Sequence, residues 1–327
     1  NPDIAFIVTV FGTLNRTTNA GLNWTEVLPP DADSTSFRDI YWQHPVNPNI
    51  IYGAYKQRIY KSTDKGTTWE FTTQNAISDN QIYSAAQSKV TPANMMIITN
   101  ESPAKVFRSS DEGYTWINIT TNGNFAGASL MNIRPDPVNG QTFYITRGSY
   151  NEGQILKTTN FGNSWIDISS DLPKIPVSDV FVDADESGVM YLGNDFGVYR
   201  TTNSGGSWQR MNNGIPFLPV TEFNLFSSGG IKLLRAATYG RGVFELNLNQ
   251  PIFVNEQGLN APAQFELLQN YPNPFNPDTK ISFRLPADSK VTLTVYNLSG
   301  KEISRLVSSR NMKAGNHSVK FSAGDLS

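Results

Sequence analysis

The chain has 327 residues, of which 39% are hydrophobic, 12% aromatic and 17% charged, with 25 Gly and 19 Pro. This aromatic-rich, turn-rich and charge-poor composition favours an all-β protein, long enough for two domains. The formal net charge of −2 and the lack of a polybasic run exclude an electrostatic footprint for nucleic acid. No run of about 18 apolar residues is present to span a membrane.

Two residue types that carry much enzyme chemistry are scarce. Cysteine is absent, which removes disulfides, thiolate metal sites and cysteine nucleophiles. The two histidines, His44 and His317, are too few for a histidine-based zinc site or a Ser-His-Asp triad. We therefore expect no metal and no cofactor, and a structural role for His44, which precedes Pro45 at a predicted strand end.

An eight-residue motif occurs five times. Its form is a small hydroxyl residue, any residue, Asp or Asn, any residue, Gly, any residue, a small polar residue and Trp, as in STDKGTTW at 62–69. The other copies span 17–24, 109–116, 158–165 and 201–208, so successive motif tryptophans lie 45, 47, 49 and 43 residues apart. One tryptophan per period of this length is the signature of a propeller or another β-repeat array.

In chain order, each repeat predicts four short strands with the motif between the third and the fourth. The first repeat shows strands at 4–10, 14–18 and 24–28 but no inner strand. The second is complete, with 37–44 innermost, then 49–55, 58–62 and 68–73. Further inner strands are expected at 81–87, 129–134 and 177–183. The last repeat has 220–226, 232–238 and 243–248, with neither motif nor fourth strand.

Residues 1–248 therefore predict a β-propeller with four full blades between two incomplete ones. Each motif is expected to form a self-satisfied turn, in which the Asp or Asn accepts backbone N–H groups two residues on, the Gly supplies a positive φ and the Trp packs against the neighbouring repeat. The residues concerned are Asn19, Gly21, Trp24, Asp64, Gly66, Trp69, Asp111, Gly113, Trp116, Asn160, Gly162, Trp165, Asn203, Gly205 and Trp208.

These motifs resemble the Asp-box, or BNR, repeat of sialidases, xyloglucanase-type glycosidases and sortilin-like receptors. The resemblance implies an Asp-box β-propeller whose motifs lie on the periphery, where they build the fold away from the ligand. Six sheets are expected here, and seven is the commonest closure in this family. We therefore expect the propeller to be incomplete at its N-terminal side, with upstream sequence supplying the remainder.

After residue 248 the period stops. Residues 249–264 predict a linker, and 265–327 predict a small immunoglobulin-like sandwich with strands at 280–285, 291–297, 303–307 and 317–321. This tail resembles the C-terminal sorting domain of the type IX secretion system of Bacteroidota. The matching residues are Tyr271, Pro272, Asn273, Pro274, Phe275, Asn276 and Pro277, then Gly300 within VYNLSGKE at 295–302 and Gly315 within AGNHSV at 314–319.

The family pattern adds one more strand beyond the point where this chain stops, so we expect the last strand to be missing. The resemblance implies interaction with the type IX secretion and sorting machinery. It also implies location outside the cell or on the outer-membrane surface of a Gram-negative bacterium. The alternative is an ordinary carbohydrate-binding or fibronectin-like sandwich.

Propellers bind ligands mainly on the face made by the loops between second and third strands and between blades. In this chain that face is predicted to include Tyr55, Arg58, Arg147, Tyr150, Asn151, Asn194, Tyr239 and Arg241. Glycoside hydrolysis needs two carboxyl groups flanking one bond, or a Tyr–Glu pair with arginines. The candidate acids are Glu101, Glu152 and Asp195, although no local motif joins them.

Three functions remain open from the sequence. The favoured one is an exported, non-catalytic propeller that binds a glycan or protein or takes part in an extracellular structure. The second is a glycoside hydrolase of the sialidase or xyloglucanase kind. The third is an accessory domain of a larger exported enzyme, such as a peptidase.

Overall fold

The regular secondary structure of the described residues is almost entirely β-strand. The computed structural model describes residues 3–9, 13–29, 40–123, 125, 129–150, 154–211, 218–249, 265–268, 270, 277–297 and 300–323. In this part of the chain the single helical segment is the 3₁₀ turn η1 (Thr120–Asn122). The chain divides into two compact units, Asn1–Val254 and Asn255–Ser327.

The first unit contains six antiparallel sheets whose strands follow one another in chain order. The four-stranded sheets are β4 (Ile40–Gln43), β5 (Ile51–Tyr55), β6 (Arg58–Ser62) and β7 (Glu70–Phe71); β8 (Ile82–Gln87), β9 (Met95–Thr99), β10 (Val106–Ser109) and β11 (Ile117–Asn118); β12 (Leu130–Pro135), β13 (Phe143–Arg147), β14 (Ile155–Thr158) and β15 (Ile166–Asp167); and β16 (Val177–Val182), β17 (Met190–Asn194), β18 (Gly197–Thr201) and β19 (Gln209–Arg210).

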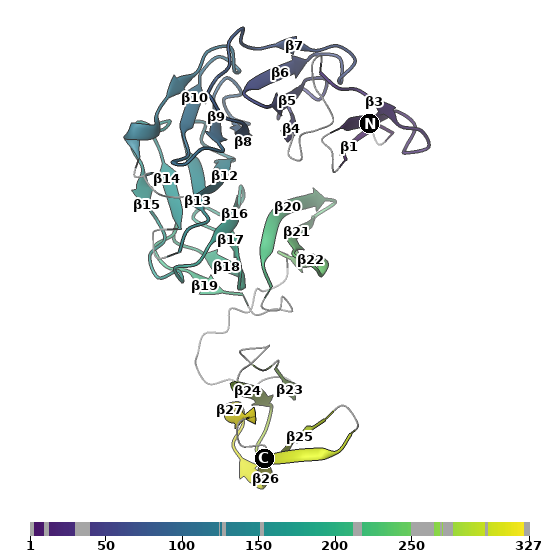
Figure 1. Cartoon of the computed structure of the whole chain (residues 1–327), viewed down its shortest axis with the longest axis vertical. Coiled ribbons are helices and arrows are strands. Elements are labelled where there is room, and N and C mark those ends of the chain that lie inside the picture. Colours follow the sequence, from purple (N-terminus) through teal and green to yellow (C-terminus); the bar gives the residue numbers. More distant parts are fainter. Residues whose placement is uncertain are drawn as a thin grey trace. The chain divides into compact units, whose positions relative to one another are not determined.

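A three-stranded sheet stands at each end of this series. The first contains β1 (Ala5–Val8), β2 (Leu14–Thr17) and β3 (Thr25–Glu26), and the last contains β20 (Val220–Ser228), β21 (Ile231–Thr238) and β22 (Gly242–Asn247). Figure 1 shows the six sheets in sequence through this unit. The inner strands of neighbouring sheets pack side by side, β4 with β8, β8 with β12, β12 with β16 and β16 with β20.

In the first unit the predicted strands are confirmed in number and order, with differences in length. The fourth strands have only two residues each, and β7 covers 70–71 of the predicted 68–73, because the turn continues up to the tryptophan. The inner strand predicted at 37–44 is seen as β4 at 40–43, and 37–39 lie outside the described residues. At the other end, β20 continues to Ser228 because a Gly229–Gly230 turn, with both φ angles positive, extends its hairpin with β21.

The burial of the strand residues follows from the packing of each sheet against its neighbours. Every residue of the second strands β5, β9, β13 and β17 is buried, because a neighbouring sheet covers each face. The corresponding strand of the first sheet, β1, has three exposed residues out of four. Large side chains such as Tyr52, Phe143 and Tyr191 fill the space between sheets and form the core of this unit.

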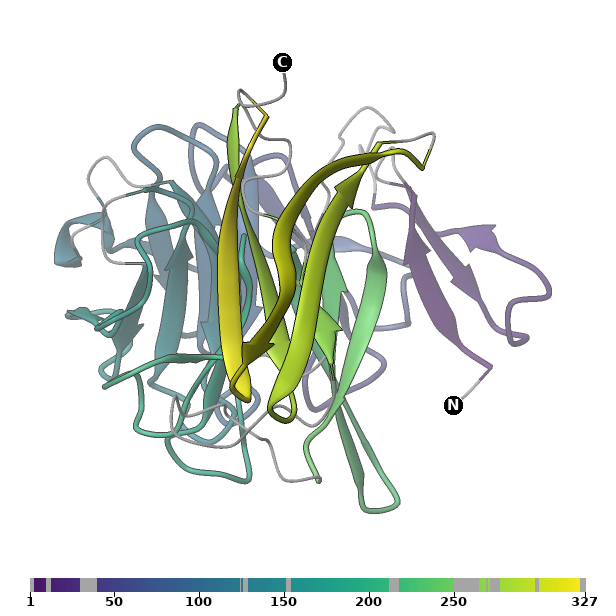
Figure 2. The same ribbon diagram turned by 90° about the horizontal axis from the view of Figure 1, so that it is seen from below.

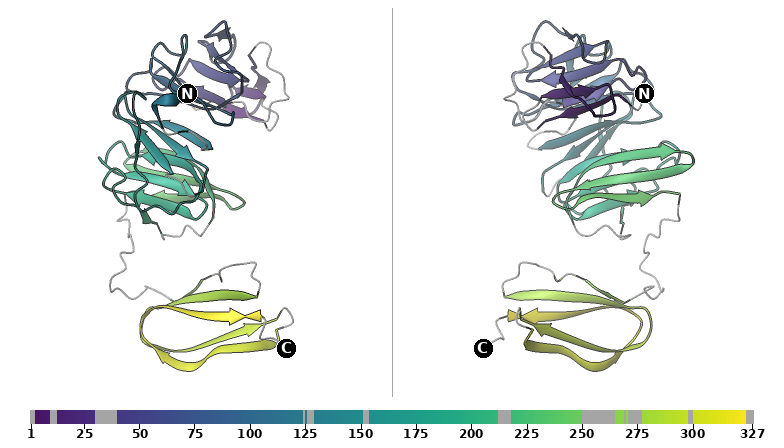
Figure 3. Two further views of the ribbon diagram at one scale, coloured as in Figure 1. Left: turned by 60° about the vertical axis from the view of Figure 1, so that its left-hand side comes forward. Right: turned by 90° about the vertical axis from the view of Figure 1, so that its right-hand side faces the viewer.

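The second unit is a small two-layer β structure. One sheet has the order β23 (Glu266–Leu267), β24 (Asp278–Leu285), β27 (Gly315–Ser322), and the other pairs β25 (Ser289–Tyr296) with β26 (Glu302–Met312). Figures 2 and 3 show these long, twisted strands. Phe283, Leu285, Val307 and Phe321 are buried. Strand β26 runs five residues past the predicted 303–307, since its pairing with β25 continues through several register shifts.

Candidate functional site

The repeated motif forms a turn that satisfies its own polar groups. In the copy at 62–69, the buried Ser62 Oγ donates to Asp64 Oδ1 (2.8 Å) and accepts the Gly66 N–H (2.7 Å). Asp64 in turn accepts the Thr68 N–H (2.8 Å) and the Thr68 hydroxyl (2.7 Å). The prediction that the carboxylate reaches an N–H two residues on was wrong, because the turn brings the N–H four residues on to the carboxylate instead.

The other four copies repeat this geometry. Asn19, Asp111, Asn160 and Asn203 each accept the N–H four residues on, and the hydroxyl of Thr17, Ser109, Thr158 or Thr201 accepts the glycine N–H. Gly66 shows two reasons why the motif requires glycine. Its φ is +83°, and a Cβ there would lie 3.2 Å from Val27 of the preceding sheet.

Two of the motif tryptophans bond their turns to the preceding sheet. Trp69 Nε1 donates to the carbonyl oxygen of Val27 (3.0 Å), and Trp208 Nε1 donates to that of Ile168 (2.9 Å). Trp208 is buried, whereas Trp24 of the first sheet is 40% exposed. The turns therefore stabilise contacts between sheets, and the motif residues are engaged in the fold.

A further signal in the sequence escaped the predictions. The residue immediately before every motif is a cation: Arg16, Lys61, Arg108, Lys157 and Arg200. Arg16 donates to the Lys65 carbonyl oxygen (2.8 Å) and Arg108 to Asn163 Oδ1 (2.8 Å), so both reach the turn of the following sheet. Lys61 contacts the following turn through an ion pair with Glu112 (2.8 Å). These three cations join consecutive repeats, whereas Lys157 and Arg200 contact Tyr144 and Tyr191 of their own sheets.

The loops between second and third strands leave the opposite ends of the sheets from these turns, as the antiparallel order requires. The predicted ligand-face residues lie in these loops or at the strand ends that flank them, and they differ strongly in exposure. Tyr55, Arg147 and Asn194 are buried, and Arg58 lies over the Phe71 ring at 4.9 Å. Tyr150 and Tyr239 are 61% and 77% exposed, and Arg241 is exposed. Asn151 and Glu152 lie outside the described residues.

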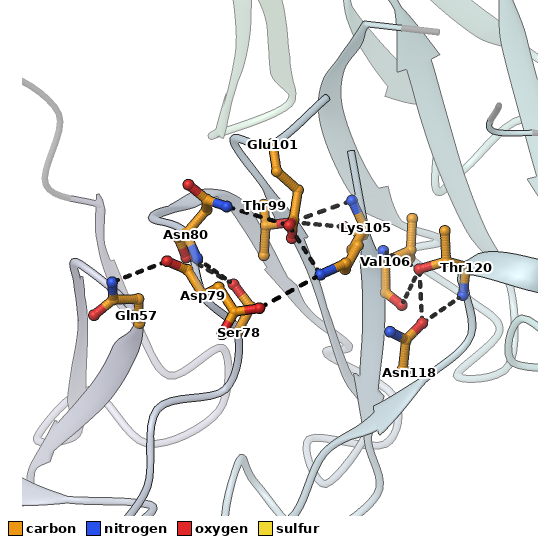
Figure 4. Close-up of polar contacts among 10 residues, drawn as sticks. All are labelled: Gln57, Ser78, Asp79, Asn80, Thr99, Glu101, Lys105, Val106, Asn118 and Thr120. Atoms are coloured by element: carbon orange, nitrogen blue, oxygen red, sulfur yellow. Dashed lines mark hydrogen bonds and ion pairs between the residues drawn. The ribbon is translucent and has the colours of Figure 1, made fainter. Parts of the chain in front are cut away.

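Glu101 belongs to a polar network shown in Figure 4. Its carboxylate accepts bonds from Thr99 Oγ1 (2.8 Å) and Asn80 Nδ2 (3.2 Å) and pairs with Lys105 Nζ (2.9 Å). Burial raises the pKa of Glu101, but the hydrogen bonds from Lys105, Thr99 and Asn80 outweigh burial and lower it below the ordinary value. This arrangement holds a carboxylate that stays ionised, whereas a general acid in glycoside hydrolysis needs a raised pKa.

Asp195 lies in the loop between β17 and β18, two sheets along from the loop of Glu101 between β9 and β10. The described residues therefore bring the predicted acids Glu101 and Asp195 to different sheets. No group of three or more His, Cys, Asp or Glu residues in the described part of the chain is arranged to hold a metal ion. Within the same residues, no helix is long and apolar enough to cross a membrane.

A second polar network, absent from the predictions, joins the inner strands. Each of β8, β12, β16 and β20 has a bulge at the same register position. The residue after it carries a polar side chain, and these connect from sheet to sheet: Ser84 donates to Asn132 (2.7 Å) and Asn132 to the fully buried Asp179 (2.8 Å). Arg134 donates from Nε and Nη2 to the two carboxylate oxygens of Asp179, both at 2.8 Å. The buried Asp179 carboxylate needs this partner, since without Arg134 its charge would lack a counter-ion in the interior.

Comparisons with known proteins agree with this architecture. Residues 269–327 match the family model of the secretion system C-terminal sorting domain. Of its predicted motif residues, 271–276 lie outside the described residues. Pro277 accepts the Ala323 N–H through its carbonyl oxygen (2.8 Å), and Gly300 and Gly315 both have positive φ. No curated protein sequence matches the chain.

Several solved structures resemble the chain in fold. One is described as YCF48 bound to D1 peptide, with 16% sequence identity and a TM-score of 0.55 over 75% of each chain. The GH74 xyloglucanase from Xanthomonas campestris has 14% identity and a TM-score of 0.56, over 75% of this chain and 42% of that one. An ancestral GH74 enzyme has 13% identity and a TM-score of 0.59, over 92% of this chain and 47% of that one.

At these identities the similarity concerns the fold alone, and this chain spans less than half of either GH74 chain. The protein is an all-β chain that combines a β-propeller with a C-terminal sorting domain, as predicted. A sorting domain of this kind implies interaction with the type IX machinery and export to the cell surface or the extracellular space.

Proposed function

We propose that the protein is a non-catalytic binding module of the outer-membrane surface or extracellular space of a Gram-negative bacterium. Its ligand is an extracellular glycan or protein, bound at the loops between second and third strands. The five repeated turns act as Asp-boxes that hold the propeller together and take no part in binding.

The exposed aromatic side chains of these loops carry the proposal. Tyr150, Phe196 and Tyr239 are 61%, 37% and 77% exposed, and they come from the corresponding loops of three consecutive sheets. Exposed aromatic rings offer large contact areas at low entropic cost and are typical of binding surfaces. In the sheets of Tyr150 and Phe196, the repeated turn at the opposite end uses its hydroxyl and amide groups in internal bonds.

The state of Glu101 supports a non-catalytic role. This carboxylate has three hydrogen-bonding partners and a lowered pKa, which suits an anchor for the loop at 100–105 and not a proton donor. Replacement of Glu101 by Gln should therefore affect the stability of that loop more than any chemistry.

A glycoside hydrolase is the second candidate, because GH74 enzymes are among the proteins of similar fold. Its strongest described acid is the partly exposed Asp195. Incubation of the complete chain with a polysaccharide panel, sialylated glycans included, separates the two functions. Bound glycan without new reducing ends supports the binding module, and reducing ends that disappear in Asp195→Asn support the hydrolase.

Export is tested separately. In the native host, the full chain should reach the culture medium or the cell surface, and a variant without residues 269–327 should stay inside the cell. Equal surface exposure of both forms would remove the export part of the proposal while leaving the binding experiment valid.

A further inference from the structure

The loops between first and second strands contain a second repeated device. In four sheets, the residue after the inner strand accepts two backbone N–H groups of the loop that follows. Ser88 Oγ accepts from Val90 and Thr91 (3.2 and 3.1 Å), and Asp136 Oδ1 accepts from Val138 and Asn139 (both 2.9 Å). Asp183 Oδ1 does the same for Asp185 and Glu186 (2.9 and 3.3 Å).

His44 occupies this position in the sheet β4–β7. Its Nδ1 accepts the N–H groups of Val46 (3.1 Å) and Asn47 (2.9 Å), so Nδ1 carries no proton and the neutral ring holds its proton on Nε2. The side chain is buried. Of the four acceptors, the imidazole is the one that gains a proton in the mildly acidic range.

The ionisable groups around His44 come from three other segments. Nε2 lies 4.0 Å from Glu112 Oε1, in the turn between β10 and β11 of the next sheet. Glu112 also pairs with Lys61 Nζ of β6 (2.8 Å) and accepts the hydroxyl of Tyr52 of β5 (3.1 Å). Lys61 in turn lies 5.4 Å from the ring centre of Tyr114.

We propose that His44 makes the loop at 44–50 an acid-labile latch, closed at neutral pH and opened by protonation of Nδ1. An added proton on Nδ1 turns an acceptor into a donor that faces two N–H donors, so both bonds must break. The imidazolium is then drawn to Glu112, which Lys61 and Tyr52 already engage.

Opening of the loop at 44–50 also affects the repeated turn of the same sheet, because the two are hydrogen-bonded. Asn49 of this loop accepts the Lys65 N–H through its carbonyl oxygen (2.9 Å), and Lys65 is the motif residue that precedes Gly66. The latch thus couples acidity to the contact with the sheet β8–β11 through Glu112, and to the contact with the sheet β1–β3 through the turn at 62–69.

The direction of the pH effect follows from the surroundings of the ring. Burial lowers the pKa of His44 from 6.5, Glu112 raises it and Lys61 lowers it, with a net decrease. A pKa that is lower in the folded state means that the stabilisation is complete above 6.5 and is lost as pH falls through the folded value. The loop should therefore be closed at pH 7.5 and open increasingly as the pH falls below 6.5.

Amide hydrogen exchange of the full chain at pH 7.5 and 5.0, corrected for intrinsic exchange rates, tests the latch. The loop at 44–50 should lose roughly tenfold protection on acidification, the effect of losing ordinary hydrogen bonds. The loop at 136–142, closed by Asp136, serves as the internal control and should keep its protection. His44→Asp, which copies Asp136 and Asp183, should abolish the acid-dependent loss.

Two further variants keep the test decisive. His44→Asn supplies a non-titrating acceptor if His44→Asp fails to fold, and His317→Gln removes the other histidine without touching the loop. Acid-dependent opening that persists in His44→Asn, or a wild-type loop that loses no more protection than the loop at 136–142, would overturn the proposal. Opening that persists in His317→Gln and disappears in either His44 variant would support it.

Discussion

The two ends of the propeller sheets are built in contrasting ways. At one end, the turns between third and fourth strands use hydroxyl, carboxylate or amide, cationic and indole groups in bonds within the turn or to a neighbouring sheet. At the other end, the loops between second and third strands leave Tyr150 and Tyr239 largely in solvent. In the five sheets that contain the motif, one end thus holds the fold together, and the loops at the other end are free to carry binding residues.

The contrast teaches how a repeat can conserve a fold while function varies. Because the hydroxyl and the Asp or Asn of every copy bond within the turn, the motif is constrained by geometry and recurs five times. The opposite loops share no motif and range from the tight turn at Asn194–Gly197 to the longer segment around Tyr150. Substitutions at the two ends should therefore have different consequences.

The largest effect is expected from a buried motif tryptophan. Trp208→Ala removes a buried ring that also donates to the Ile168 carbonyl oxygen, and should lower the free energy of unfolding by about 3–5 kcal/mol. Trp24→Ala, at a ring 40% exposed, should cost less than about 1.5 kcal/mol. Urea unfolding followed by tryptophan fluorescence measures both, and reports on the propeller alone because all six tryptophans lie before residue 254. Equal losses would contradict the role assigned to burial.

The motif hydroxyl comes next. Ser62→Ala leaves the Gly66 N–H without its acceptor in a buried position, which should destabilise the unit by about 1–3 kcal/mol. The neighbouring Thr63→Ala, on an exposed side chain, is the matched control and should stay within about 0.5 kcal/mol. A neutral Ser62→Ala would mean that the turn is held by the Asp and Trp alone.

A smaller effect is expected on the stability of the fold at acid pH. Hydrogen bonds from the N–H and hydroxyl of Thr68 lower the pKa of Asp64 to about 2. Burial raises the pKa of Asp111, but its bonds to Thr115 and Ser109 outweigh burial and lower it. A carboxylate whose pKa is depressed in the folded state stabilises the fold at pH values above its unfolded pKa of 3.8. This stabilisation is lost as the pH falls towards the folded pKa.

Asp64→Asn with Asp111→Asn should flatten that acid dependence, since Asn holds the same bond at positions 19, 160 and 203. We expect a change well below about 1 kcal/mol per site between pH 4 and 2, because solvent screens these carboxylates. Thermal unfolding across this range is the measurement. Identical pH profiles for the wild type and the double variant would show that other groups govern acid unfolding.

The smallest change in stability is expected at the loop end. Tyr150→Ala and Tyr239→Ala remove exposed rings and should leave the free energy of unfolding within about 0.5 kcal/mol of the wild type. Denaturant unfolding of each variant checks this. A loss above about 2 kcal/mol would mean that these rings pack as part of the fold, which would remove the basis for a free binding surface.

Much of the fold could be predicted because its signals are local. The tryptophan period, the turn glycines and the short apolar runs each depend on neighbouring residues, and they located six sheets correctly. The lengths of the fourth strands depend on how far each turn extends before pairing begins, which the motif alone does not define. The prediction of which N–H group Asp64 accepts was wrong for the same reason, since the answer depends on the path of the turn.

The exposure of the candidate site residues could not be predicted from the sequence, because it depends on how neighbouring sheets pack. Tyr55, Arg147 and Asn194 were predicted in loops, but they are the last residues of β5, β13 and β17 and are buried, a result that depends on neighbouring repeats. The Arg134–Asp179 pair joins strands 45 residues apart, and its register depends on bulges that leave no clear mark in the sequence. The cation before each motif was a readable signal, visible once the five copies are aligned.

Binding of the complete chain to a glycan and polysaccharide panel, with new reducing ends measured in the same samples, tests the central claim most directly. We predict binding without release of reducing ends, weakened about tenfold or more in Tyr150→Ala with Tyr239→Ala and unchanged in Thr63→Ala. If no glycan binds, the same variants applied to proteins captured from the surface of the native host test the protein-ligand form of the claim. Release of reducing ends that is lost in Asp195→Asn or Glu101→Gln would contradict the account and identify a hydrolase.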